Sequence, residues 1–240
     1  KEVSDMVITD DNFASIVDAI RLGRRIFDNI KKAMAYILAV HVPIAGMAML
    51  PVLFGAPLVL LPAHIVFLEL IVDPASALLF ESEPAEADVM QRPPRSLGKR
   101  LFGIRAIARN GLQGVIALLF VFATYWITLG WTHDETVTRA AAFTALVLSN
   151  LGLILVNRSD SASVFEALRL KNKTFVWLVC ATLLMLTLVL YIPAAREVFR
   201  FGHLDARMIL VALGSGLLTV AICILVRKLW KPEILKQKAA

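Results

Sequence analysis

Six long apolar segments constrain the fold of this 240-residue chain more than any other feature. They cover about residues 33–53, 58–80, 111–129, 140–156, 174–192 and 208–229. A helix needs about 20 apolar residues to cross the hydrocarbon core of a bilayer. Hydrophobic residues make up 58% of the chain and charged residues 18%, whereas soluble domains are nearer half and a quarter. The sequence therefore predicts an all-α membrane protein, a bundle of six transmembrane helices.

Lysine and arginine are concentrated between alternate apolar segments. Residues 1–32, 80–110, 157–173 and the tail from 227 hold 21 of the 25. Because cytoplasmic loops carry the excess of Lys and Arg, both termini are expected in the cytoplasm of a multi-pass protein of the cell membrane. The formal charge of +6 is explained by this orientation, so no nucleic-acid partner is expected.

The polar N-terminal residues form a part of their own. Residues 1–32 are expected to be cytoplasmic, with a short strand at 6–9 and then a helix capped by Asp10 or Asp11. The helical pattern continues without proline into the first apolar segment, which makes a stiff link between water and membrane. Residues 33–240 form the predicted transmembrane domain. The opening "KEVSDMVITDD" resembles neither a signal peptide nor a start site, which suggests a fragment of a longer protein.

The second apolar segment carries the strongest functional signal, "HIVFLELIVDPASALLF". Glu69 and Asp73 are four residues apart and share one helix face, at a depth where ionisable groups cost about 2.5–3.5 kcal/mol each. Pro74 has no N–H, so the carbonyl of Leu70 loses its helical partner. Two carboxylates and a free carbonyl are ligands that a hard cation prefers. The bland alternative is a proline kink with one acid at the interface and the other protonated.

Polar residues in other segments are weaker candidates. His41 lies mid-segment, two residues before Pro43, and is a metal ligand, a partner of the acids or a packed neutral imidazole. Asn150 either offers an amide oxygen to the same site or forms a hydrogen bond between helices. His64, near the outer end of the second segment, is expected to be interfacial.

Two stretches resemble P-type cation ATPases. "SDMVITDDNFASIVDAIRLGRRIFDNIKKAMAYIL" resembles the junction between the phosphorylation domain and the fifth transmembrane helix, and "EADVMQRPPRS" resembles the loop after the sixth. "FTALVLSNLGLILVNRS" is similar to the eighth helix of bacterial members. The resemblance covers essentially the whole chain. It implies that residues 1–32 are the end of an α/β phosphorylation domain plus a stalk helix, and that the six segments are helices five to ten.

The resemblance also implies which residues bind the transported ion. Calcium pumps have Asn and Asp on the sixth helix where this chain has Glu69 and Asp73. On the fifth helix they have Asn and an acid where it has His41 and Ile44. The acid of their eighth helix is missing, and Asn150 lies nearby. These departures fit one cation site better than two, and they leave Ca²⁺, Mg²⁺, Mn²⁺ or a softer divalent ion open.

The family's phosphorylated Asp-Lys-Thr-Gly-Thr motif and its nucleotide-binding domain are absent from this chain. The chain is therefore expected to hold no catalytic residue and no cofactor, while ATP and Mg²⁺ belong to the full-length pump. Its expected partners are the bilayer and the missing N-terminal half of the pump with helices one to four. The predicted function is cation binding and translocation in an ATP-driven pump, for a divalent, Ca²⁺-like ion. The alternatives are a secondary cation transporter, which also uses broken helices, and a non-catalytic membrane scaffold.

Overall fold

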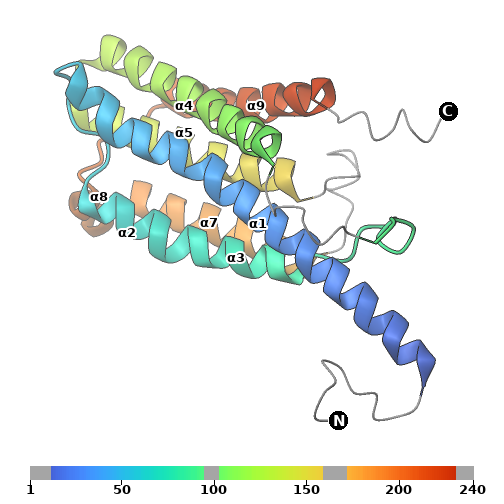
Figure 1. Ribbon diagram of the computed structural model, residues 1–240. Helices are drawn as coiled ribbons and strands as arrows, with labels where there is room; N and C mark the ends of the chain where they lie inside the picture. The colour runs from blue at the N-terminus through green and yellow to red at the C-terminus, as the bar shows by residue number, and fades with distance from the viewer. Residues whose placement is uncertain (1–11, 95–102, 159–171, 231–240) are drawn as a thin grey trace.

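A computed structural model describes residues 12–94, 103–158 and 172–230, and these ranges contain helices and no strand (Figure 1). The helices are α1 (Phe13–Leu53), α2 (Pro62–Val66), α3 (Asp73–Ser82), α4 (Ile104–Thr132), α5 (Glu135–Asn157), α7 (Lys173–Tyr191), α8 (Pro193–Phe199) and α9 (Ala206–Leu229). A π-helix, η1 (Phe67–Val72), joins α2 to α3. Six helical stretches are long and apolar enough to cross a membrane, with α2, η1 and α3 together forming one of them. The predicted fold class is confirmed.

Helix α1 runs for 41 residues without interruption, through both Pro43 and Pro51. Its N-terminal part projects from the bundle (Figure 1), so the predicted continuous helix is confirmed, while its role as a stiff link stays a prediction. The predicted cap is wrong: the side-chain oxygen of Asn12 accepts the N–H of Ala14 at 3.0 Å, so the helix begins after Asn12. The strand predicted at 6–9 lies outside the described residues.

Helix α5 lies at the centre of the bundle. It packs against α1, α4, α9 and α7, and its residues are buried along most of its length. A helix that is apolar all round must be covered all round, and this one is. In Figure 1 it lies behind α1, between α4 and α9 on one side and α3 and α7 on the other.

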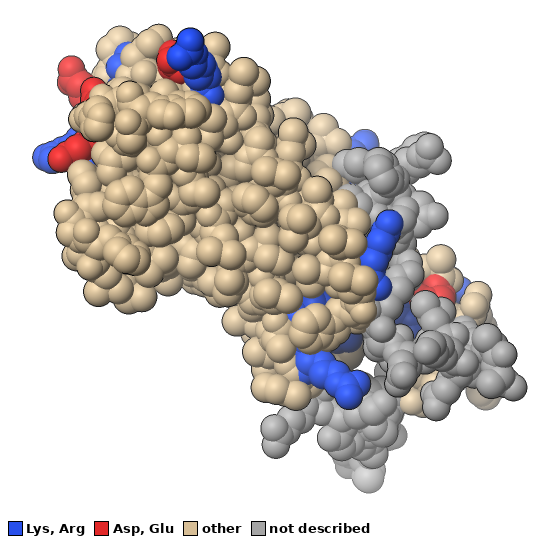
Figure 2. Space-filling view, turned by 90° about the horizontal axis from the view of Figure 1, so that it is seen from above, with Lys and Arg blue, Asp and Glu red and all other residues tan. Residues whose placement is uncertain are grey.

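The outer surface of the bundle is apolar between two charged ends. Figure 2 shows a broad area without Asp, Glu, Lys or Arg, flanked by charged groups at opposite ends. Large apolar side chains are exposed on several helices, including Leu119 of α4, Leu184 of α7 and Leu217 of α9. A surface of this kind fits lipid rather than water.

Helices α1 and α4 pack closely because one residue has no side chain. A Cβ on Gly114 would collide with the backbone carbonyl of Ala39 and with the side chain of Val42. Glycine at this contact lets the two helix backbones approach, as small residues do in membrane bundles. The close contact fixes α1, which carries His41, against the rest of the bundle.

The segment after α3 is held against the projecting part of α1. Lys32 forms a buried ion pair with Glu86 at 2.6 Å, and the Asn29 amide donates to the carbonyl of Glu83 at 2.9 Å. The Glu83 carboxylate pairs with Arg158 at 2.6 Å, and both side chains are inaccessible to solvent. These contacts join the middle of α1 to the ends of α3 and α5 on one side of the bundle.

Further along this segment, Arg92 binds two carboxylates, those of Asp88 and Asp28, each at 2.7 Å. The hydrogen bond with Asp88 and the charge of Asp28 raise the pKa of Arg92 above its ordinary value. Arg92 therefore stays charged, and it ties residues 83–94 to α1 through Asp28.

His64 is buried in an aromatic cluster at the other end of the bundle. Its ring lies 4.9–5.3 Å from the rings of Phe143, Phe199 and Phe201, centroid to centroid. Its Nδ1 accepts the backbone N–H of Leu61 at 2.9 Å. Residues distant in sequence therefore bury the ring, and the expected position of His64 at the membrane interface stays a prediction.

Candidate cation site

Three ionisable side chains from two spans converge on one point. His41 of α1, Glu69 of η1 and Asp73 of α3 each offer a ligating atom, and these atoms lie within 4.8 Å of one another. The distance from His41 Nε2 to Glu69 Oε1 is 3.8 Å. In the described part of the chain, this is the one group of three or more His, Cys, Asp or Glu residues with that geometry. A cation bound between them would contact one nitrogen and two carboxylate groups.

The helix that carries the two acids changes type at the site. Phe67–Val72 is π-helical, and the N–H of Asp73 bonds to the carbonyl of Leu68, five residues earlier. Pro74 follows at once and cannot donate a backbone hydrogen bond. The predicted break therefore takes the form of a wide turn next to Pro74 rather than an unwound segment. Single π turns in helices occur often at functional sites.

The hydrogen bond of His41 directs one ring nitrogen to the acids. Its Nδ1 lies 2.8 Å from the carbonyl of Ile37, a distance at which Nδ1–H donates to that oxygen. In this tautomer, Nε2 carries the lone pair, and it is Nε2 that faces Glu69. Metal-binding histidines commonly donate the other ring N–H to a carbonyl in this way. This geometry fits two of the three roles considered for His41, a metal ligand or a hydrogen-bond partner of the acids, better than the third, a packed neutral imidazole.

Two hydroxyl groups beside Asp73 were not foreseen. The Tyr36 hydroxyl lies close enough to Asp73 to interact with its carboxylate, and it is 3.4 Å from the Ser76 hydroxyl. Ser76 also donates to the carbonyl of Val72 at 2.7 Å. Tyr36 is buried, and its ring packs on Phe80. In the sequence, Tyr36 stands five residues before His41 in an apolar segment. It could not be assigned to the site, because an aromatic residue at such a position is equally expected in the packed interior of the bundle.

Within the described residues, the Asn150 amide forms no hydrogen bond to the three residues, and Leu70 adjoins Glu69 in η1. Asn150 is fully buried in α5, and neither atom of its amide has a hydrogen-bond partner among the described residues. Its neighbour Ser149 instead lies 3.3 Å from Thr219 of α9, hydroxyl to hydroxyl. Leu70 has a side chain that is 71% exposed on the outer face. The amide of Asn150 and the carbonyl of Leu70 remain predicted ligands.

The family to which this architecture belongs follows from a comparison with known families. A model described as "Cation transporting ATPase, C-terminus" matches residues 57–230, well over half of the chain. The chain belongs to this family.

Relatives of this cation-transporting ATPase C-terminus occur in bacteria and animals. A calcium-transporting ATPase of Bacillus subtilis is 32% identical over 83% of the chain, and one of Listeria monocytogenes is 33% identical over 83%. The human calcium-transporting ATPase type 2C member 1 is 28% identical over 99% of the chain. The chain spans only 22–26% of the length of these relatives. It is therefore similar to the C-terminal part of calcium-pump-like ATPases, and with its six apolar helices it is a multi-pass membrane protein.

The site of this family member is open on one side. The side chains of His41 and Glu69 are 49% and 45% exposed, on a face that the described chain leaves uncovered. Lipid contact with ionisable groups at this depth would cost several kcal/mol.

Proposed function

We propose that this chain is the cation-translocating part of an ATP-driven P-type pump, and that His41, Glu69 and Asp73 bind the transported ion. The observation that supports this is that their ligating atoms lie within 4.8 Å of one another, at the point where the span that carries Glu69 and Asp73 becomes π-helical. The proposed ion is divalent and of the Ca²⁺ type, because two carboxylates balance its charge and the named relatives are calcium-transporting ATPases. Asn150 and the Leu70 carbonyl are proposed to complete the oxygen ligands.

The chemistry of ATP is assigned to the rest of the full-length protein. ATP and Mg²⁺ would act on a phosphorylation domain that precedes residue 12, and α1 would transmit its motion to His41. The uncovered face at His41 and Glu69 is proposed to contact the membrane helices of that N-terminal half. After ion release, protonation would neutralise Glu69 and Asp73, because two bare carboxylates in a low dielectric repel each other.

The test is Asp73→Asn in the full-length protein, with cation-dependent phosphorylation by ATP as the readout. We expect the cation concentration for half-maximal phosphorylation to rise at least about tenfold, since one of two charged ligands is lost. Glu81→Gln is the matched control, because Glu81 lies in the same helix α3 but is exposed at its end. Unchanged cation dependence in Asp73→Asn would refute the site.

A second candidate ion is favoured by one contact. Nε2 of His41 faces Glu69 as a free lone pair, and imidazole nitrogen suits first-row transition metals better than Ca²⁺. Transport of a softer divalent ion such as Zn²⁺ is therefore proposed as the alternative to Ca²⁺. Phosphorylation of the full-length protein with each cation in turn distinguishes the two.

A further inference from the structure

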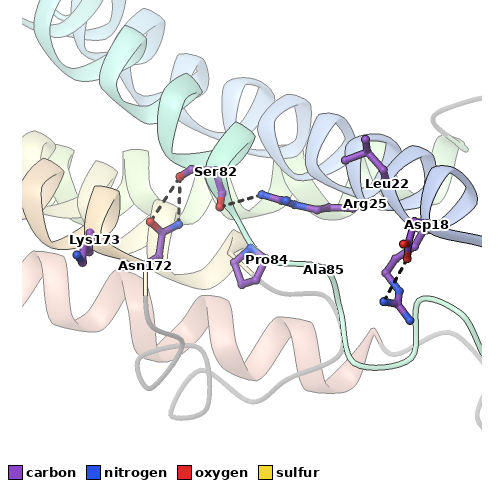
Figure 3. Close-up of a pocket in the computed structure, with 9 residues that line it drawn as sticks. Asp18, Leu22, Arg25, Ser82, Pro84, Ala85, Asn172 and Lys173 are labelled. Atoms are coloured by element: carbon purple, nitrogen blue, oxygen red, sulfur yellow. Dashed lines mark hydrogen bonds and ion pairs between the residues drawn. The ribbon is translucent and has the colours of Figure 1, made fainter. Parts of the chain in front are cut away.

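A pocket of about 410 Å³ lies away from the cation site, where α1, the end of α3 and the start of α7 meet (Figure 3). Ser82 ends α3, and Lys173 is the first residue of α7. The Ser82 hydroxyl and the Asn172 side chain lie 3.3–3.4 Å apart and join these two helix ends. Since both helices are membrane spans, the pocket lies at the membrane surface, on the side predicted to be cytoplasmic.

Positive charge dominates the pocket. Arg21, Arg25 and Lys173 line it, against the single carboxylate of Asp18, which forms an exposed ion pair with Arg21 at 3.8 Å. Arg25 is held in place by the carbonyl oxygens at the end of α3, to which it donates at 2.8 and 3.3 Å. Lys173 is exposed, and no ion pair is recorded for it within the described residues. The start of α7 adds a partial positive charge beside Lys173.

An apolar surface continues from the pocket towards the membrane interior. Trp177 lies one turn below Lys173 on the same face of α7, and its side chain is 75% exposed. Val176 beside it is also exposed, and Leu22 contributes apolar surface to the pocket itself. A ligand that fits both parts has an anionic head and an apolar tail.

We propose that this pocket binds the phosphate group of an anionic phospholipid. Arg21 and Lys173 contact the phosphate oxygens, Arg25 adds its charge from a fixed position, and the acyl chains lie along Val176 and Trp177. The carboxylate of Asp18 disfavours a second negative charge, so the preferred head is a phosphodiester with one charge rather than a phosphomonoester with two. The proposal depends on the membrane position of α3 and α7 and not on the cation site.

The test uses the full-length protein in detergent, with native mass spectrometry as the readout. Phosphatidylglycerol is expected to bind more tightly than phosphatidylcholine of the same chain length. Lys173→Gln is expected to weaken phosphatidylglycerol binding about fivefold, and the double variant with Arg21→Gln further, since each basic residue near the headgroups contributes about equally. Lys228→Gln, which removes an exposed charge in the last turn of α9, should leave binding unchanged.

Three further measurements make the outcome decisive. Lys173→Arg should restore binding, and the unfolding temperatures of the variants should match that of the wild type. Equal affinity for the two lipids, or wild-type affinity in the double variant, would overturn the proposal. Displacement of phosphatidylglycerol by equimolar glycerol phosphate would assign the pocket to a soluble phosphate ester and overturn the lipid assignment. Cation-dependent phosphorylation is measured separately, so the two sites can fail independently.

Discussion

His41 distinguishes this site from one made of carboxylates alone. Its Nδ1 is occupied by the Ile37 carbonyl, which keeps Nε2 available towards Glu69. A neutral nitrogen ligand adds affinity for borderline metals without adding negative charge to the site.

We expect His41→Asn to change which ion the full-length protein prefers. An amide oxygen in place of the nitrogen should weaken activation by Zn²⁺ about tenfold relative to activation by Ca²⁺. The measurement is cation-dependent phosphorylation across a concentration series of each ion. A ratio that does not move would mean that Nε2 is not a ligand.

Asp134 caps the N-terminus of α5 and gives a pH-dependent contribution to the stability of the protein. Its carboxylate accepts the hydroxyl and N–H of Thr136, both at 2.7 Å, and the N–H of Val137 at 3.3 Å. The hydrogen bonds with Thr136 lower the pKa of Asp134 below its ordinary value of 3.8. The stabilisation is therefore complete well above pH 3.8 and is lost as the pH falls through the lowered pKa.

Asp134→Ala should destabilise the protein by about 1 kcal/mol at neutral pH. Thermal unfolding of the full-length protein in detergent at several pH values measures this. The difference from the wild type should shrink as the pH drops below about 4. Asp134→Asn is the control, because an amide oxygen still caps the helix and should retain most of the stability at neutral pH.

At the scale of elements, the contact between α1 and α4 depends on Gly114. We expect Gly114→Leu to force the two backbones apart, because a side chain there meets the carbonyl of Ala39. The cost of overpacking is about 1–3 kcal/mol or more, and thermal unfolding in detergent would register it. A Cβ on Gly111 of the same helix would meet nothing within 4 Å, so Gly111→Leu should be tolerated.

Breaking the buried ion pair of Arg158 and Glu83 is expected to lower the free energy of unfolding more than breaking a surface ion pair. Arg158→Met leaves the Glu83 carboxylate buried without its partner, which should cost about 3–5 kcal/mol. Adding Glu83→Gln should recover part of this loss. Arg21→Met, which breaks an exposed pair with Asp18, should cost less than about 1 kcal/mol. Denaturant unfolding of the wild type, these three variants and Glu83→Gln alone gives the comparison, and losses that simply add in the double variant would contradict the coupling.

The spans could be predicted from the sequence because apolar length alone determines what can cross a bilayer. Glu69 and Asp73 could also be found from the sequence, because charged residues are rare within such apolar segments. The π turn could not, because it depends on how α2 and α3 pack. The Arg158–Glu83 pair was equally hidden: each residue flanks an apolar segment and resembles an ordinary interfacial charge until the fold joins them.

At the scale of the whole molecule, the orientation in the membrane is a prediction that can be tested directly. In a background without Cys180 and Cys223, Met90→Cys and His203→Cys place thiols at opposite ends of the bundle. A membrane-impermeant maleimide applied to intact cells should label residue 203 within minutes. It should label residue 90 only after permeabilisation, because residues 83–94 are expected in the cytoplasm. The reverse pattern would invert the topology.

The length of α1 determines how far His41 moves inside the membrane when the tip of the helix at Phe13 moves outside it. Its 41 residues span about 60 Å, twice the hydrocarbon thickness of about 30 Å. About 30 Å of it lies between Phe13 and the predicted membrane surface near Ala33, and about 12 Å between that surface and His41. If the helix pivots there, a swing of about 5 Å at its tip moves His41 by about 2 Å. That is about half of the 3.8 Å between Nε2 and Glu69, so a modest tilt is enough to make or break the contact.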